Sequence, residues 1–262
     1  MAEDLPFDRR LRRLRRDRAF RADPESRKSL ALVLADELID RLGAVRRDFA
    51  DALIVGAAGP AIGSRLRARG MKVSVADAGF AFARAGGGVQ CDEDRLPFAD
   101  ASHDLVIAAG SLDSVNDLPG GLVLMRRILR PGGLLLGAFA GAGSLVALRT
   151  AFAAADADRN FAVPRIHPQI DVRAAGDLLA RAGFVAAVAD SQSLHPRYAR
   201  LNDEIRDLRA MGGTNSLVHR ARLMVDRVTL AAARKAFRDH AEADGRTSER
   251  IEIVHFVGWA PK

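Results

Sequence analysis

The stretch that most constrains the fold is DALIVGAAGPAIGSRLRARG, residues 51–70. An apolar run ends at Gly56, small residues follow, and a charged pattern with helical spacing continues to Gly70. A buried strand, a tight turn and a helix produce this order. Gly56 lacks a side chain and lets a ligand approach the backbone, while a helix that begins near Pro60 would point its N-terminal amides at that ligand. The stretch indicates either a nucleotide-binding turn or an ordinary tight connection between a strand and a helix.

The same alternation of strand and helix continues after residue 70. A helix is expected over residues 120–133, where Pro131 and two glycines end it. Strands that alternate with helices predict an α/β fold with a mostly parallel sheet covered on both faces. Ligands of such sheets bind beyond the carboxyl ends of the strands. The predicted strands are 52–56, 72–77, 87–90, 103–112 and 134–140.

The second half of the chain has a different rhythm. Helical patterns cover 144–159 and 172–184, a strand-like run follows at 185–190, and an alternating strand closes the chain from residue 249. We expect a helical insertion at about residues 191–248 between these last two strands. The predicted organisation is a basic N-terminal arm, residues 1–28, followed by one domain, residues 29–262.

Composition narrows the class of protein. Hydrophobic residues make up 48% of the 262 positions and charged residues 28%, which is typical of a globular domain. The sequence contains no uninterrupted apolar run of about 18 residues, so we expect no membrane span, and the charged N-terminus argues against a signal peptide. Cys91 is the only cysteine, which excludes an internal disulfide and favours a reducing compartment. A cytoplasmic location is the expectation.

The N-terminal arm holds much of the net charge. Residues 1–28 carry ten Lys and Arg against six Asp and Glu, a local charge of +4 out of +7 for the chain. Leu11 and Leu14 stand among the arginines at helical spacing. The arm is either a docking segment for RNA, an acidic protein or anionic lipid, or a solvated helix that packs one narrow apolar edge on the domain. The interspersed acids and the lack of interleaved aromatic residues argue against nucleic acid.

Acidic residues follow the second and third predicted strands. Asp77 ends the second strand about twenty residues after the turn at Gly56, where a carboxylate can accept both hydrogen bonds of a ribose diol. Asp92, Glu93 and Asp94 follow the third strand, where one carboxylate can accept the exocyclic amine of an adenine. A helix cap for Asp77 and a plain acidic turn for residues 92–94 are the alternatives.

Candidates for catalysis are fewer. Asn116 and Asp117 follow the fourth strand and either meet a substrate or cap the next helix. His167 is a candidate base or substrate contact, or a plain loop histidine, and His195 with Tyr198 either form part of a lid or pack it. The scattered histidines and the single cysteine predict no metal site.

The chain resembles class I S-adenosylmethionine-dependent methyltransferases in the order of five segments: LIVGAAGP, VSVAD, CDEDRLPF, HDLVIAAGSL and ILRPGGLLLGAF. A narrower resemblance covers roughly residues 6–260. It is to the family of complex I assembly factor 5 and malonyl-carrier-protein methyltransferase-like proteins. The segments that carry it are FDR, VNDLPG, RIHPQIDVRAAGDLLARAGF, LRAMGGTNSL and IEIVHFVGWAPK.

The resemblance implies a Rossmann-like fold with a seven-stranded sheet, bound S-adenosylmethionine and methyl transfer to a protein or carrier-bound substrate. It also implies a connection with respiratory complex I assembly, in which the eukaryotic member is credited with hydroxylating an arginine. A non-catalytic assembly factor on the same fold is the alternative. The resemblance places Gly56 beside the methionine part of the cofactor, Asp77 on the ribose, Asp92 with Glu93 on the adenine amine, and Ser111 with Leu112 at the methyl-transfer side. The full set of cofactor-binding positions is Gly56, Ala57, Gly59, Asp77, Ala78, Asp92, Glu93 and Ser111.

The chain departs from the family at the first loop. Ile54 replaces an acid that usually supports the loop, while Ala58 and Pro60 replace two of its glycines. Asp113 and Ser114 stand where the family usually has an aromatic pair. These changes bear directly on whether the loop still holds the cofactor.

Overall fold

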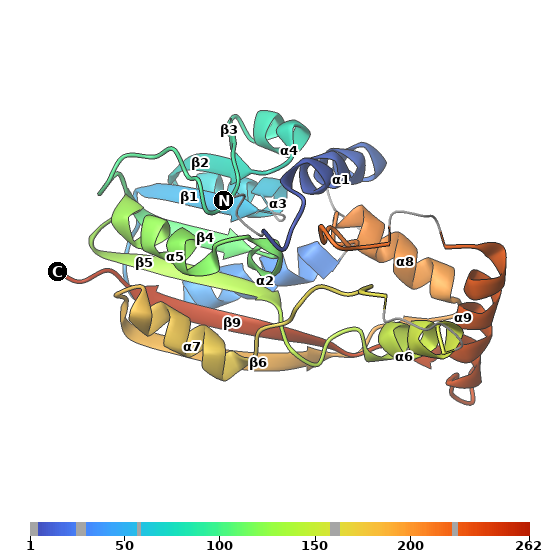
Figure 1. The fold of residues 1–262 in the computed structure, drawn as a ribbon. Helices are drawn as coiled ribbons and strands as arrows, with labels where there is room; N and C mark the ends of the chain where they lie inside the picture. The colour runs from blue at the N-terminus through green and yellow to red at the C-terminus, as the bar shows by residue number, and fades with distance from the viewer. Residues whose placement is uncertain (1–4, 25–29, 57–58, 158–162, 222–224) are drawn as a thin grey trace.

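The computed structural model describes residues 5–24, 30–56, 59–157, 163–221 and 225–262. Its centre is a seven-stranded sheet in the order β3-β2-β1-β4-β5-β9-β6 (Figure 1). The first five strands of that order run parallel, and β9 and β6 pair antiparallel at the end. The predicted α/β fold with a mostly parallel sheet is confirmed. The strands are β1 Asp51–Gly56, β2 Lys72–Asp77, β3 Val89–Gln90, β4 His103–Ala109, β5 Leu129–Ala140, β6 Val185–Leu194 and β9 Ile251–Trp259.

Side chains that alternate along the central strands form a core on each face of the sheet. Leu53 of β1 packs on one face with α5 (Leu118–Ile128) and α7 (Val172–Arg181). Its neighbour Ile54 packs on the other face with α2 (Leu30–Gly43) and α3 (Gly59–Ala68). Both side chains are fully buried, which explains why these strands read as continuous apolar runs. Ile54, where the family has an acid, is therefore a core residue.

The helix expected over residues 120–133 is shorter than predicted. α5 ends at Ile128, and β5 begins at Leu129 and continues through Pro131. His103 of β4 pairs with Leu129, and the register then shifts before Leu105 pairs with Leu134. The proline and glycines therefore lie in an irregular first part of the strand, and periodicity alone did not separate the two elements.

The insertion also begins later than predicted. β6 continues to Leu194, because β9 offers it backbone partners along its whole length, down to the pair Leu194–Ile251. A short antiparallel ribbon of β7 (Arg197–Tyr198) and β8 (Thr247–Ser248) closes the insertion. Between them lie α8 (Leu201–Ala210) and α9 (Arg227–Asp239), which pack with α6 (Val146–Ala155) around a separate small core. Figure 1 shows this helical group beyond one end of the sheet.

The first helix, α1 (Arg9–Ala22), lies over the carboxyl ends of β2 and β3, against α4 (Phe80–Ala85) and α8 (Figure 1). The sequence suggested a narrow apolar edge at Leu11 and Leu14. The structure instead buries Arg12, Arg16 and Ala19 of this helix, while Leu14 is 44% exposed. Of the two alternatives, the helix does pack on the domain, but not through an apolar edge, because the surface beneath it is acidic and accepts arginines.

Candidate functional site

The turn after β1 requires a glycine. Gly56 has φ +92, and a Cβ built on it would lie 2.6 Å from Cβ of Ser111. Both the left-handed backbone and the close approach exclude a side chain. Ser111 itself is buried after β4, and its Oγ has no hydrogen-bond partner within the described ranges. Of the other predicted loop positions, Ala57 and the replaced Ala58 lie outside the described residues, and Gly59 begins α3.

The predicted carboxylates meet at one edge of the sheet. Asp77 ends β2, and Asp92 and Glu93 follow β3; each is 2% exposed. The parallel pairing of β2 with β3 brings Asp77 opposite Gln90. Asp92 and Glu93 follow soon after Gln90 in the chain, so they lie near Asp77. Ala78, buried next to Asp77, accepts a hydrogen bond from Gln90 Nε2 at 3.0 Å. These predicted positions therefore lie together where the fold binds ligands.

Arginines of α1 already contact these carboxylates. Four arginines lie on one side of the helix, because they form pairs three or four residues apart: 9/12, 9/13, 12/16 and 13/16. Arg12 and Arg16 each present two nitrogens to one carboxylate, in the forked geometry that only a guanidinium provides. The nearest nitrogen–oxygen distance is 2.6 Å in each of the pairs Arg9–Asp94, Arg12–Glu93, Arg13–Asp92 and Arg16–Asp77.

Two of these pairs are buried. Arg12 and Arg16 are 6% and 5% exposed, so neither charge is solvated by water to any extent. Burial opposes the charge on Arg12, yet Glu93 outweighs it and raises the pKa of that guanidinium. Removing one partner of such a pair leaves the other charge buried alone, which costs about 3–5 kcal/mol. The remaining pairs are more exposed on their arginine side and contribute less.

The backbone of α1 also lies close to the loop after β2. A Cβ built on Gly79 would lie 2.6 Å from Cβ of Arg16 and 3.3 Å from its carbonyl carbon. Gly79 donates its N–H to Asp77 Oδ1 at 2.7 Å, which fixes the carboxylate beneath the helix. The contact thus involves the main chain of both segments as well as the arginine side chains.

The residues at this edge fit S-adenosylmethionine in type and place. Asp77, the carboxylate predicted to bind the ribose, ends β2, and Gly56 leaves space next to Ser111, whose hydroxyl has no hydrogen-bond partner among the described residues. Asp92 Oδ1 is buried and accepts no hydrogen bond from the described part of the chain, so it can take an amine. The same oxygens of Asp77 that would accept ribose hydroxyls are occupied by Arg16.

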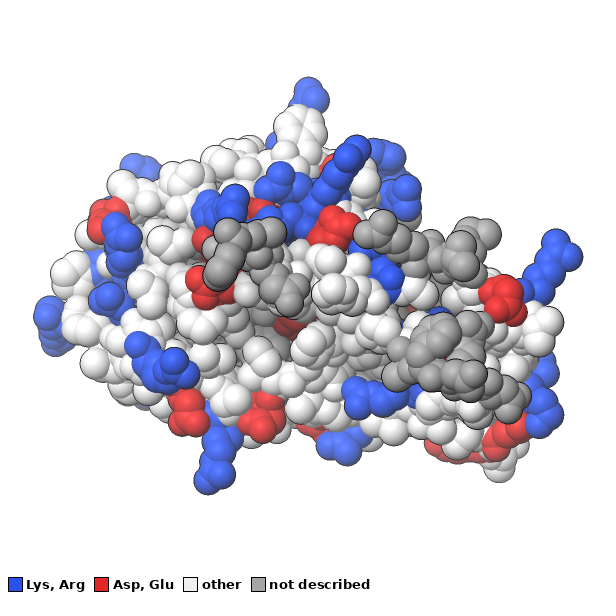
Figure 2. Space-filling model, in the orientation of Figure 1, with Lys and Arg blue, Asp and Glu red and all other residues white. Residues whose placement is uncertain are grey.

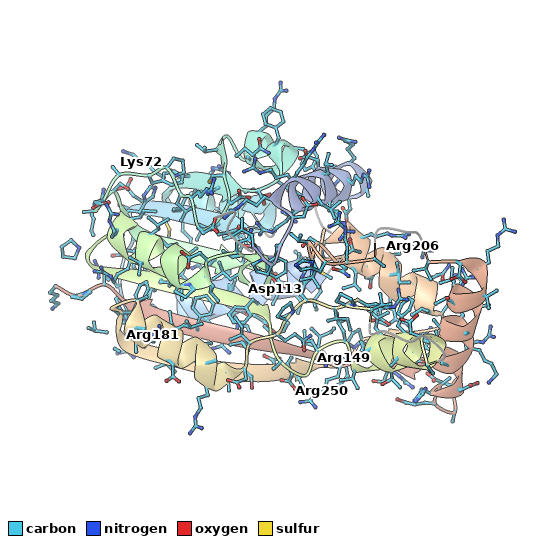
Figure 3. All side chains as sticks on the ribbon, in the orientation of Figure 1. Lys72, Asp113, Arg149, Arg181, Arg206 and Arg250 are labelled. Atoms are coloured by element: carbon cyan, nitrogen blue, oxygen red, sulfur yellow. The ribbon has the colours of Figure 1, made fainter. Side chains whose placement is uncertain are left out.

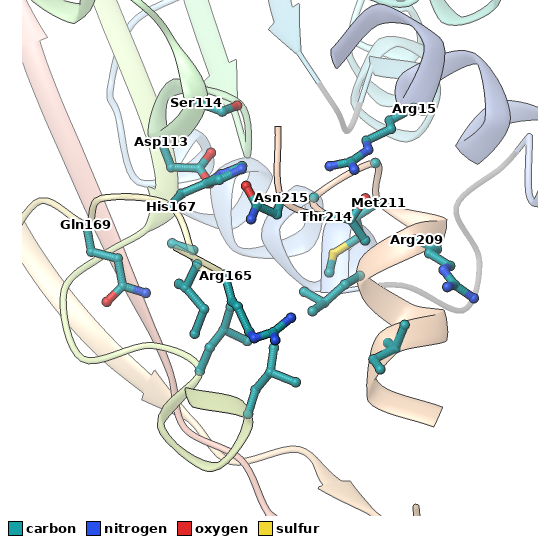
Figure 4. Close-up of a pocket in the computed structure, with 18 of the residues that line it drawn as sticks. Arg15, Asp113, Ser114, Arg165, His167, Gln169, Arg209, Met211, Thr214 and Asn215 are labelled. Atoms are coloured by element: carbon teal, nitrogen blue, oxygen red, sulfur yellow. The ribbon is translucent and has the colours of Figure 1, made fainter. Parts of the chain in front are cut away.

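A cavity of about 370 Å³ opens beside this edge, at Gly110 and Ser111 beyond the end of β4 (Figure 4). Apolar side chains from several elements form much of its wall. Its polar residues include Asp113, His167 and Arg15. Figure 3 places Asp113 in the interior, between the sheet and the helices α1 and α8. The main apolar lining residues are Leu30, Leu34, Leu145, Leu148, Phe152 and Ile253.

Burial shifts the pKa values of Asp113 and His167, two of the titratable groups that line the cavity. Burial raises the pKa of Asp113 to about 6, although the nearby Arg12 opposes the shift. Burial, with Arg15 and Arg12 adding to it, lowers the pKa of His167 to about 4, so this ring is neutral at pH 7. His167 Nε2 accepts a hydrogen bond from the backbone N–H of Ser216 at 2.9 Å. His167 lines the cavity, but its Nε2 accepts this hydrogen bond and is not available as a base, whereas the carboxylate of Asp113 is.

Arg15 is a cation at the cavity that forms no ion pair with any carboxylate of the described residues. Its Nη1 is buried without a hydrogen-bond partner in the part of the chain that the structure describes. Burial, followed by the cations Arg220 and Arg18, lowers its pKa to about 10. In Figure 4 the side chain extends from α1 toward the side of the cavity that holds Asp113 and His167. An anionic group in the cavity would supply the missing partner.

The remaining candidates have structural roles. Asn116 exchanges two hydrogen bonds with the backbone of Phe7 and so holds the segment that leads into α1. Asp117 caps α5 by accepting a hydrogen bond from Gly120 N at 2.8 Å, so of its two predicted roles the structure shows the helix cap. His195 is exposed between β6 and β7, and Tyr198 packs on the small helical core; neither lines the cavity. Leu112 is buried in the main core.

Sequence reasoning missed the arginines that face the site. The spacing of Arg9, Arg12, Arg13 and Arg16 was visible, but it was interpreted as a solvated face. Figure 2 shows Lys and Arg side chains gathered over this part of the surface, with acidic side chains between them. Among the described residues, no group of three or more His, Cys, Asp or Glu side chains could hold a metal ion. No helix in the described ranges is long and apolar enough to cross a membrane.

Comparison with known proteins gives one family and one fold. Residues 63–137 match the family described as "Methyltransferase domain", whose cofactor is S-adenosylmethionine. The chain is 30% identical over 264 residues to the mitochondrial arginine-hydroxylase NDUFAF5 of Mus musculus, covering 97% of this chain and 77% of that protein. It is 37% identical over 170 residues to the malonyl-[acyl-carrier protein] O-methyltransferase of Xylella fastidiosa, which covers 65% of this chain and 56% of that protein.

Other matches extend over less of the relative. The NDUFAF5 of Danio rerio is 34% identical over 176 residues, which span 66% of this chain and 54% of that protein. The chain thus spans about half the length of the zebrafish and Xylella relatives. Among solved structures, the [4+2]-cyclase SpnF superposes with a TM-score of 0.53 at 14% identity, covering 100% of this chain and 89% of that one. A Haemonchus contortus phosphoethanolamine N-methyltransferase, solved with S-adenosylhomocysteine, gives a TM-score of 0.52 at 13% identity, covering 87% of this chain and 52% of that one. These likenesses show the fold alone.

Proposed function

Since this chain belongs to the NDUFAF5 family of methyltransferase-fold proteins, we propose that it binds S-adenosylmethionine and transfers a methyl group to an anionic acceptor presented by a protein or an acyl carrier. The observation that carries the proposal is the cavity beside Ser111. It begins where the methyl side of the cofactor is expected, and it is lined by the half-buried Arg15, whose buried Nη1 has no hydrogen-bond partner in the described chain.

Each residue of the site has a part in this proposal. Asp77 accepts the ribose hydroxyls, and Asp92 with Glu93 accepts the adenine amine. Gly56 leaves room for the methionine part. When bound, the cofactor supplies an electrophilic methyl group. The protein's own contribution is to hold the acceptor in line with that methyl group and to keep water out of an apolar cavity.

Arg15 and Asp113 have different roles toward the acceptor: Arg15 binds it, and Asp113 acts as a base. Arg15 binds its anionic group, which places the reacting atom toward Ser111. A carboxylate acceptor needs no base, because it is already a nucleophile. For a hydroxyl or amine acceptor, the Asp113 carboxylate, whose pKa is raised to about 6, takes up the proton that methylation releases.

A second candidate is favoured by the acidic strand ends that α1 covers, Asp77 and Asp92–Asp94, which we call the acidic groove because they would form one if α1 were displaced. The relatives named arginine-hydroxylase act on arginine, and this groove binds four arginine side chains of its own chain. An arginine of a partner protein could occupy the same groove. In that case we propose a complex I subunit as the partner, and the protein acts as an assembly factor that modifies or chaperones it. For either candidate we propose a cytoplasmic location, because a chain whose only cysteine is Cys91 has no internal disulfide and suits a reducing compartment.

The test combines binding with a product assay. The purified protein is titrated with S-adenosylhomocysteine and then incubated with S-adenosylmethionine and malonyl-loaded acyl carrier protein. We expect micromolar binding, about −8 kcal/mol, and a methyl ester on the carrier. Arg15→Ala should abolish the ester and leave cofactor binding intact, whereas the exposed Arg18→Ala should change neither ester formation nor cofactor binding. A complex I subunit that gains an oxygen atom on arginine, with no methyl ester on any carrier, would support the second candidate instead.

A further inference from the structure

We infer that α1 is a displaceable plug: in the position seen here its arginines compete with S-adenosylmethionine for the same carboxylates, so α1 must shift off the strand ends before the cofactor binds, and Arg15 then meets the acceptor from the shifted helix. The inference rests on the proposed cofactor site and adds its regulation. Three features carry it: the arginines block Asp77, the backbone of α1 covers the same loop, and α1 can move away from it.

The block is at Asp77. Arg16 donates to both of its oxygens, at 3.2 Å to Oδ1 and 2.6 Å to Oδ2, and Gly79 N–H takes a further position on Oδ1. The carboxylate is only 2% exposed beneath these groups. A ribose diol needs the same acceptor oxygens and the same space. Arg12 takes both oxygens of Glu93 in the same way, so the adenine end is covered too.

Rotation of the arginine side chains would not clear the site. Main-chain and Cβ atoms of Arg16 pack directly on Gly79, so close that the glycine has no room for a side chain. The Arg16 guanidinium also stacks over Phe82 of α4, 4.1 Å from the ring centroid. Because the helix backbone itself covers the loop after β2, the cofactor can reach Asp77 only if α1 moves.

The helix is built so that it can leave. Its buried residues are Arg12, Arg16 and Ala19, and its apolar contacts include the ring of Phe20 against that of Phe82 at 5.0 Å. Undocking therefore exposes this aromatic contact together with charged side chains that water solvates well. Leu14, its most exposed apolar residue, already faces solvent. Asn116 holds the backbone of Phe7 just before the helix, and a bridge joins Phe7 to Leu217, so the helix can swing while the chain before it stays anchored.

The competing ligands are balanced by linkage. If the docked state is the ground state, the observed affinity for cofactor equals the affinity of the released state multiplied by the fraction of molecules in which α1 is released. Weakening the arginine contacts must then tighten cofactor binding, although the arginines touch the site. A supporting role for these arginines in holding the cofactor predicts the opposite sign.

The experiment titrates S-adenosylhomocysteine into the wild type, into an Arg12→Gln/Arg16→Gln variant, and into an Arg10→Gln/Arg18→Gln variant. The control pair lies on the same helix with exposed side chains. We expect the first variant to bind roughly tenfold tighter than the wild type and the control to match the wild type. Amide hydrogen exchange of residues 9–22 in the wild type, with and without S-adenosylhomocysteine, is the second readout, and it needs no variant. We expect the ligand to increase exchange there.

Unchanged protection of residues 9–22 in the ligand-bound wild type would overturn the inference, and so would weaker binding by a folded Arg12→Gln/Arg16→Gln variant. Failure of the proposed function looks different. In that case neither the wild type nor the folded variant with the weakened plug binds S-adenosylhomocysteine at all.

Discussion

The two halves of the site treat charge in opposite ways. At the strand ends under α1, each of the carboxylates Asp77, Asp92 and Glu93 faces an arginine. In the neighbouring cavity, Arg15 has a buried nitrogen with no partner in the described chain, and burial keeps the pKa of Asp113 near 6. The first half is satisfied by the protein itself and must be opened for a ligand. The second half leaves charges unsatisfied, which a ligand would complete.

The difference is clearest in two adjacent arginines of one helix. Arg16 is buried against Asp77, while Arg15 points into the cavity. Their surroundings, and not their residue type, decide whether each stabilises the fold or serves a ligand. Four substitutions test this contrast, in order of decreasing expected effect.

Arg16→Ala should lower the free energy of unfolding by about 3–5 kcal/mol, because it leaves Asp77 buried without its partner. Urea denaturation followed by circular dichroism measures the loss, with the exposed Arg18→Ala as control, expected within about 0.5 kcal/mol of the wild type. The double variant Arg16→Ala/Asp77→Asn should lose clearly less than the sum of the two single variants. Additive losses would show that the pair is not coupled.

Gly56→Ala should cost about 2–4 kcal/mol, since it combines a left-handed backbone with a steric clash at Ser111. Gly70→Ala is the matched control: Gly70 has φ +83, but an added Cβ would meet nothing within 4 Å. It should cost only the backbone strain, about 1–2 kcal/mol. Thermal unfolding of both variants gives the comparison. Equal losses would mean that Ser111 does not press on the turn.

Asp113→Asn should stabilise the protein by about 1–2 kcal/mol at pH 7.5 or so. The folded pKa of Asp113 is raised from 3.8 to about 6, so the folded protein retains a proton that the unfolded chain has already lost. Wild-type stability therefore falls, relative to the variant, as the pH rises from about 4 to about 6, and then stays level. Unfolding curves across pH 4–8 or so measure this. A constant difference between the two proteins over this range would contradict the assigned pKa.

Arg15→Met should leave stability within about 0.5 kcal/mol or raise it by up to about 1 kcal/mol, because it removes a buried charge that no group of the described chain pairs. Its thermal midpoint is compared directly with that of Arg16→Met, which should fall. A loss of stability at Arg15 as large as at Arg16 would show that the cavity arginine has a structural partner, and it would remove the basis for an anionic acceptor.

Much of the scaffold was predictable from the sequence. The apolar runs fixed which segments become buried strands, and the positions just after them, Asp77, Asp92 and Ser111, therefore share one edge. The failures have a common cause. The end of α5, the length of β6 and the face that α1 buries all depend on partners distant in sequence; Arg16 and Asp77, for example, are 61 residues apart.

Local sequence determined the strand, turn and helix order, the need for glycine at Gly56, and the acidic residues at the strand ends, because these follow from hydrophobic periodicity and backbone sterics. Tertiary structure alone decided what those acids contact. Packing of α1 against α4 and α8 turns Arg12 and Arg16 inward, and the same packing leaves Arg15 facing an apolar cavity. Burial sets the energy of a charge, and burial is a property of the whole fold.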